Sequence, residues 1–219
     1  MEKLTLKIIG TTPLLMHRDS VEHADAMGEL LKSTKKGQSG PAGDDRWPSY
    51  RWVGYCYHDE RDRLCIPAQN LFSCLLKGAV DFKPAGATKK QSIKPFVSCE
   101  IAVGDAILTK PALTIEQIEH AIEPYVGDFK STKEAVERDL GFALDVRRAK
   151  VGSAKHVRVR PMFYDWEASC DVVLACDKIS KAQALELFAH CGMFVGVGDW
   201  RPGAPTPGLY GKFRVEIVK

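Results

Sequence analysis

The segment 145–160, DVRRAKVGSAKHVRVR, concentrates positive charge that could bind phosphate. It carries four arginines and two lysines against one aspartate, a net of +5, whereas the whole chain of 219 residues has a net charge of +3. A second segment, 83–94, adds four lysines and no acid. Clustered cations of this kind bind nucleic-acid backbones, because each neutralised phosphate releases counterions. The alternative is a solvated two-faced hairpin in which valines alternate with arginines.

The predicted phosphate contacts come from both segments. The loop is expected to supply Lys89, Lys90 and Lys94, and the ribbon Arg147, Arg148, Lys150, Lys155, Arg158 and Arg160. Contacts to phosphate position a strand without reading its bases, so the predicted binding is largely independent of nucleic-acid sequence.

Aromatic side chains accompany the charge. Five of them crowd into residues 47–57, where Trp52 or Tyr55 could stack on unpaired bases beside the planar cation of Arg51. The alternative is that they pack in the core. Trp200 and Arg201 lie in the glycine-rich stretch 196–211, where glycine would let a sugar-phosphate approach the backbone closely.

Sequence signals for catalysis or cofactor binding are weak. The Gly-Val-Gly at 196–198 follows a predicted helix and precedes a predicted strand, the reverse of a dinucleotide fingerprint. The chain has no GxxxxGK[ST] motif and no cysteine or histidine pair with zinc spacing. We therefore predict no catalytic residue, no metal and no cofactor.

The elements that must position these residues form a recognisable order. Alternating or β-branched runs predict strands near 4–10, 96–103, 168–176 and 212–218, and helices are predicted near 67–81 and 181–194. This is the βαββαβ order of an α+β, ferredoxin-like or RRM-like domain with an antiparallel sheet. We expect one domain spanning 1–219, with insertions at about 19–64 and 105–165.

The insertions carry further predicted elements. Residues 19–49 are expected to form a long polar loop with a short helix around 24–31, and segments 50–57 and 63–66 a hairpin. Segment 145–160 is expected to be a second, basic hairpin. Thr114 with Gln117, and Ser180 with Gln183, are capping boxes that predict helix starts.

The cysteines and the apolar runs of the sequence indicate in which cellular compartment the protein is expected. Seven cysteines are scattered and several lie in apolar runs, which favours reduced thiols. No apolar run reaches the length of a membrane span. A cytoplasmic protein with no membrane partner is expected.

Three segments in this order resemble the RAMP superfamily, the ferredoxin-fold RNA-binding proteins of CRISPR effector complexes. They are GTTPLLMHR (10–18), CIPAQNLFSCLLKGAV (65–80) and GVGDWRPGAPTPGLYGKFRV (196–215). The similarity is greatest to the backbone subunits that line up along the guide RNA. Segments 46–64 and 145–160 would then correspond to the palm and thumb insertions of that family. The chain departs from it in its short length and in the PGAPTP that interrupts the glycine loop.

This resemblance implies a non-catalytic subunit that binds single-stranded nucleic acid, most readily guide RNA, and assembles with copies of itself or with other subunits. It also implies an alternative, because some members process guide RNA with a histidine general acid or base. His17, with Arg18 beside it to hold a phosphate, and His23 occupy the matching region. A second alternative is a divergent, phage-borne protein that binds single-stranded DNA.

Overall fold

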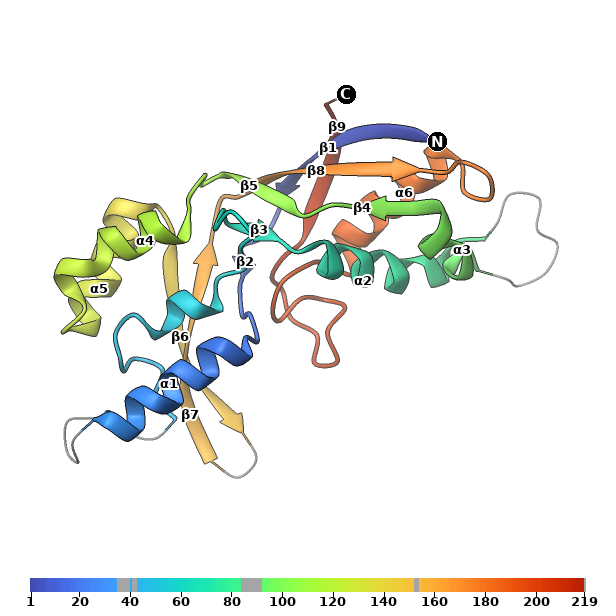
Figure 1. The fold of residues 1–219 in the computed structure, drawn as a ribbon. Helices are drawn as coiled ribbons and strands as arrows, with labels where there is room; N and C mark the ends of the chain where they lie inside the picture. The colour runs from blue at the N-terminus through green and yellow to red at the C-terminus, as the bar shows by residue number, and fades with distance from the viewer. Residues whose placement is uncertain (35–39, 41–42, 84–91, 152–153, 219) are drawn as a thin grey trace.

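The main sheet of the protein is antiparallel and brings distant segments together (Figure 1). The computed structural model describes residues 1–34, 40, 43–83, 92–151 and 154–218. The strand order is β3-β5-β8-β1-β9, and β4 also pairs with β8. The strands are β1 (Glu2–Gly10), β3 (Cys65–Ile66), β4 (Ile101–Val103), β5 (Ala106–Lys110), β8 (Glu167–Leu174) and β9 (Phe213–Ile217).

The central strand β1 shows why the sheet forms. Its alternate residues Leu4, Leu6 and Ile8 are buried, as period-two patterning requires for a sheet with one covered face. Leu6 lies opposite Cys170 of β8 on one side and Ile217 of β9 on the other. The predicted strands at both ends of the chain are therefore neighbours in the sheet.

Two helices cover the same side of this sheet (Figure 1). They are α2 (Ala68–Gly78), which follows Pro67, and α6 (Lys181–Phe194), whose predicted capping box of Ser180 and Gln183 is confirmed. The helices approach closely at Gly78, where an added Cβ would lie 2.3 Å from Cys191 Sγ.

A second, three-stranded sheet of order β2-β7-β6 extends away from the main one. It consists of β2 (Leu14–Leu15), β6 (Ala143–Val151) and β7 (Ala154–Phe163). The basic hairpin predicted at 145–160 is confirmed, with Arg147 opposite Arg158 and Lys150 opposite Lys155. Residues 43–45 bond to the other edge of β7, since Val157 N–H donates to Gly43 and Asp45 N–H donates to Val157.

The remaining helices decorate the two sheets. The helix α1 (Val21–Ser33) begins at the N-cap Ser20 and is longer than the predicted 24–31. The predicted capping box of Thr114 and Gln117 opens α4 (Ile115–Ile122). The others are α3 (Lys94–Glu100), α5 (Phe129–Ala135), the 3-10 helices η1 (Arg51–Tyr55), η2 (Ala79–Asp81) and η3 (Glu123–Tyr125), and the π-helical turn η4 (Val136–Leu140).

Two predicted elements are only partly present. The hairpin of 50–57 and 63–66 is limited to the antiparallel bridge of His58 with Leu64, because residues 51–55 form the 3-10 helix η1, and β3 pairs with β5. The predicted strand 96–103 is a strand only at 101–103, because residues 94–100 form α3 with Pro95 in its first turn. Proline favours the first turn of a helix, where its missing N–H costs nothing.

One cluster of buried apolar side chains continues from the main sheet into the hairpin. It includes Leu6 of β1, Leu108 of β5, Ile118 of α4 and Val159 of β7. The base of the hairpin is thus anchored in the core. Over the described residues, no helix has both the length and the apolarity needed to cross a membrane.

Candidate nucleic-acid interface

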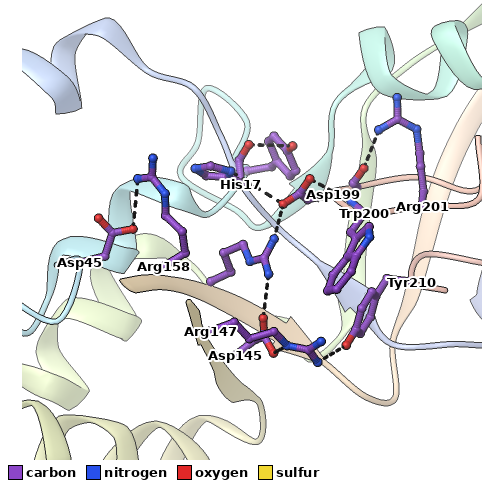
Figure 2. A network of polar contacts seen from close by, with 12 residues as sticks. His17, Asp45, Asp145, Arg147, Arg158, Asp199, Trp200, Arg201 and Tyr210 are labelled. Atoms are coloured by element: carbon purple, nitrogen blue, oxygen red, sulfur yellow. Dashed lines mark hydrogen bonds and ion pairs between the residues drawn. The ribbon is translucent and has the colours of Figure 1, made fainter. Parts of the chain in front are cut away.

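One face of the hairpin carries an ion-pair network rather than free positive charge (Figure 2). The buried carboxylate of Asp145 accepts from Arg147 Nε at 2.6 Å and from Arg160 at 2.9 Å. Arg160 also donates to Asp199 at 2.7 Å. The charge that looks unbalanced in the sequence is therefore partly neutralised, here by Asp145 and by Asp199 from the loop after α6.

A second buried carboxylate, Asp45, balances two more arginines. Its oxygens lie 3.4 Å from Arg51 Nε and 3.4 Å from Arg158 Nη1. Asp45 reaches this position because the segment 43–45 bonds to the edge of β7. Asp45 is 1% exposed, so its charge acts where water screens little. Arg51 and Arg158 are consequently held in place before any ligand binds.

The exposed cations of the hairpin lie on its opposite face. Arg148, Lys150 and Lys155 are exposed and form no ion pair with any residue that the structure describes. Lys150 and Lys155 are directly opposite, a like-charge pair that destabilises a hairpin unless an anion neutralises it. This arrangement supports an anionic ligand at the free end of the hairpin.

A groove of about 620 Å³ runs along the hairpin at β6. The β6 side provides residues 147–150, and the loop after α6 provides residues 199–200 and 204–206. β6 is the edge strand of its sheet, so its backbone is not covered by another strand of the described chain. The groove therefore combines cations, edge backbone and an aromatic side chain in one channel.

Trp200 is the aromatic side chain of this groove. The Arg147 guanidinium carbon lies 5.2 Å from the centre of the Trp200 ring, and the Tyr210 ring centre lies 5.8 Å from it. Arg147 also donates to the Tyr210 hydroxyl. Trp200 has φ +49°, a left-handed conformation that costs free energy in a non-glycine residue. Trp200 is half-buried as a residue and lines the groove.

The glycines of the loop after α6 pack against protein backbone. Gly198 has φ +77°, and an added Cβ would lie 2.6 Å from the Leu15 carbonyl oxygen. At Gly211, with φ +69°, the added Cβ would lie 1.8 Å from the Val197 carbonyl oxygen. These two glycines let the loop close on itself and on residue 15. At these two positions glycine is needed for contact with the protein's own backbone, whereas the sequence predicted contact with a sugar-phosphate.

A second cavity, of about 430 Å³, lies between the hairpin and α1. Its lining includes His17, Arg18, His23, Arg51 and Arg158. Burial lowers the pKa of both His17 and His23 below the ordinary value, so both imidazoles favour the neutral form. His17 Nδ1 lies 3.7 Å from Asp199, which links this cavity to the groove.

The other predicted site residues are dispersed. Trp52 is fully buried against Phe142, which does not fit the expected stacking on bases. Tyr55 is 7% exposed and presents its ring to His17 at a centroid distance of 4.8 Å. Burial raises the Tyr55 pKa. Tyr55 therefore supports the second cavity instead of offering an open stacking surface.

Three lysines and one arginine complete the set of predicted residues. Lys94 is exposed in α3, which lies at the far end of the molecule from the hairpin (Figure 1). Lys89 and Lys90 fall outside the described residues. Arg201 points away from the network and donates to the Gly198 carbonyl at 2.7 Å (Figure 2). Arg201 thus stabilises the loop that carries Trp200.

Sequence reasoning missed the acids and the second aromatic residue of the site. Asp45, Asp145, Asp199 and Tyr210 hold the arginines and the tryptophan in place. Asp145 alone lay within the basic segment, where its position opposite Arg160 could have suggested a pair. The other three approach the hairpin only through the tertiary fold.

No protein-family model matches the chain, and a search of curated proteins finds no match either. Among the described residues, no group of three or more histidine, cysteine, aspartate or glutamate side chains is placed to hold a metal ion.

Proposed function

We propose that the protein binds single-stranded nucleic acid, largely without sequence preference, in the groove between β6 and the loop after α6. The observation that carries this proposal is the groove itself, which Arg148 and Lys150 of the edge strand β6 line together with Trp200, while Lys155 lies opposite Lys150 in the hairpin. Cations that follow the backbone and an aromatic side chain for a base are the two parts of a single-strand site.

The ion pairs determine which cations of the groove would be free to bind phosphate. Arg147 and Arg160 face Trp200 and are oriented by Asp145, so they form a preorganised wall with little spare charge. The three exposed cations would supply most of the salt-dependent attraction, because each can release a counterion from one phosphate. Trp200 would stack one base and so favour unpaired strands over duplex.

A ferredoxin-like core and membership of the RAMP superfamily remain part of this proposal. Support comes from the order β1, α2, β4 with β5, β8, α6, β9 along the chain and the order β9-β1-β8-β5 in the sheet. The hairpin β6–β7 would be the thumb-like insertion. In this account the chain is a cytoplasmic backbone-type subunit that assembles along guide RNA with copies of itself or other subunits. The alternative ligand is phage single-stranded DNA.

Fluorescence anisotropy tests the binding proposal. Labelled single-stranded RNA, single-stranded DNA and duplex, each of about 12 nucleotides, are titrated with protein at low salt. Binding of a single strand in preference to duplex is expected, and it should weaken when Trp200 becomes Ala. Equal binding to duplex, or no binding at low salt, would refute the proposal. Nuclease sensitivity of the nucleic acid that copurifies then distinguishes RNA from DNA.

A second candidate function is metal-independent cleavage of RNA. The observation that favours it is the placement of His17 and His23 around one cavity with Arg18, where a neutral imidazole could accept a proton and the arginine could hold the phosphate. Incubation of labelled RNA with protein and a chelator tests it. Products that disappear in His17→Ala or His23→Ala, while binding persists, would establish cleavage. Intact RNA would exclude it.

A further inference from the structure

Three arginine side chains line the cavity between the hairpin and α1. Arg18 belongs to the segment before α1, Arg51 begins η1, and Arg158 projects from β7. The segment before α1 is fixed by backbone bonds, since Met16 N–H donates to Pro161 and Arg18 N–H donates to Tyr55. Three arginines from three separate elements thus line one preformed space, and the guanidinium of Arg18 also contacts His58 beside it.

The acids around this cavity do not use up its hydrogen-bond donors. Arg51 and Arg158 share the single carboxylate of Asp45 at 3.4 Å, and a guanidinium has five N–H donors. Asp19 also lines the cavity but makes no ion pair with a described residue. Three buried atoms beside the cavity make no hydrogen bond to a described residue: Arg51 Nε and Asp45 Oδ1, which lie 3.4 Å apart, and His23 Nε2. An oxyanion ligand could supply acceptors to the guanidinium N–H groups of Arg51 and Arg158 that Asp45 alone cannot pair.

The first turn of α1 adds backbone donors to the same cavity. The helix has 13 residues, and its N-cap Ser20 lines the cavity with His23 and Ala24. The Ser20 hydroxyl accepts from His23 N–H, while the first N–H groups of the helix keep no partner within it. The positive end of the helix dipole therefore adds to the three arginines, and the Glu22 carboxylate, which accepts from the Ser20 hydroxyl at 2.7 Å, offsets part of it.

His23 is held in the cavity wall by a close contact. A Cβ added at Gly54 of η1 would lie 2.2 Å from His23 Nδ1, so only glycine leaves room for this imidazole. The ring also meets Tyr55 edge-on at a centroid distance of 5.7 Å. A change at position 54 can therefore displace His23 without removing any charge.

We infer that this cavity binds a phosphate monoester, namely the terminal phosphate of the strand bound in the groove. The inference rests on the proposed function. A terminal phosphate carries up to two negative charges and three acceptor oxygens, whereas an internal phosphodiester carries one charge and two free oxygens. Three arginines, a helix N-terminus and two imidazoles match the larger charge and the larger number of acceptors.

The groove and the cavity are adjacent along one strand. Arg158 lines the cavity and Arg160, two residues further along β7 on the same face, lines the groove. Figure 2 shows His17 of the cavity beside Asp199, and Arg160 donates to the same carboxylate. A strand lying along β6 and Trp200 can thus place its end in the cavity, where α1 closes the far side.

Anisotropy with matched strands tests the inference. Strands of about 12 nucleotides carrying a 5′-phosphate, a 3′-phosphate or hydroxyls at both ends are compared for wild type, Arg51→Gln and Gly54→Ala. Arg138→Gln, an exposed arginine outside the cavity, is the matched control. One terminal phosphate should raise affinity at least about tenfold, as expected for charge-assisted bonds. The ratio should fall toward one in Arg51→Gln and Gly54→Ala but not in Arg138→Gln.

The outcomes separate the two proposals. Equal affinity for phosphorylated and hydroxyl ends would overturn the terminal-phosphate site and leave strand binding standing. Binding of a nucleoside 5′-monophosphate in the cavity, with no gain for phosphorylated strands, would assign the site to a free nucleotide and overturn the inference. Cleavage of the labelled RNA would overturn the inference and assign the cavity to the ribonuclease activity instead. Failure of every strand to bind would remove the proposed function and this inference together.

Discussion

Replacing Arg148, Lys150 and Lys155 together by Gln should weaken strand binding in a salt-dependent way. These three side chains are exposed and make no ion pair with a described residue, so the substitutions leave no buried partner without its counter-charge. Removal of the opposed like charges at Lys150 and Lys155 should leave folding stability unchanged or slightly higher. The effect on binding can therefore be measured in a folded protein.

The magnitude follows from counterion release. A single strand contributes about 0.7 to the slope of log K against log salt for each neutralised phosphate, so three lost contacts should reduce the slope by about 2. Over a fourfold salt range, about 50 to 200 mM, this slope difference corresponds to an affinity change of about 16-fold. The largest difference between wild type and variant is expected at the lowest salt.

Anisotropy titrations across that salt range measure the slope, with melting temperatures to verify folding. The control replaces Lys130, Lys133 and Lys178, which lie outside the groove, and changes the net charge equally; Lys130 and Lys178 are exposed and Lys133 is half-buried. The control should keep the wild-type slope. Equal loss of slope in both variants would show that overall charge attracts the strand and would refute the assignment of these three residues.

Three further predictions concern the framework of the site. Asp145→Asn should lower the free energy of unfolding by roughly 2–4 kcal/mol, because it removes the buried counter-charge of Arg160, and denaturant titration measures this. Stability should fall as the pH drops below about 6.5, since the folded-state pKa values of His17 and His23 are lowered and protonation favours the unfolded chain; denaturant midpoints between about pH 7.5 and 5.5 measure this. Gly198→Ala should cost at least about 1–2 kcal/mol by thermal unfolding, because φ is +77° and the Leu15 carbonyl lies too close.

Each of these has a contrasting outcome. An Asp145→Asn protein as stable as wild type would mean that Asp199 alone suffices for Arg160. If the double variant His17→Gln/His23→Gln loses as much stability between those pH values as wild type, other groups cause the loss. Gly28→Ala is the reference for Gly198, because its added Cβ meets nothing within 4 Å and alanine favours the helix. A cost at Gly198 no larger than at Gly28 would contradict the close packing.

The sequence predicted the parts of the fold whose signals are local. Alternation identified β1 and β8, and the two capping boxes located the starts of α4 and α6. The errors arose where tertiary packing decided the conformation. Residues 51–55 contain strand-favouring aromatics, yet they form η1 because Trp52 and Tyr55 fill the core between the hairpin and α4.

The candidate site was predictable only in its charges. The basic segment and Trp200 could be identified from composition, but the partners of Arg158 and Arg160 are Asp45 and Asp199, which are far away in sequence. Which cations remain free is a property of the folded chain, since alternation along β6 separates Arg148 from the paired Arg147. The burial of Trp52 and Tyr55, which the sequence offered as stacking residues, is likewise a property of the folded chain.

Ultraviolet crosslinking with peptide mapping tests the central claim most directly. A labelled single strand is crosslinked to the wild-type protein and the modified residues are identified by mass spectrometry. Crosslinks are predicted in the stretch 147–150 and at Trp200, the two walls of the groove, and they should be lost with an excess of unlabelled strand. Crosslinks confined to other surfaces, such as α3 at the far end of the molecule, would contradict the account.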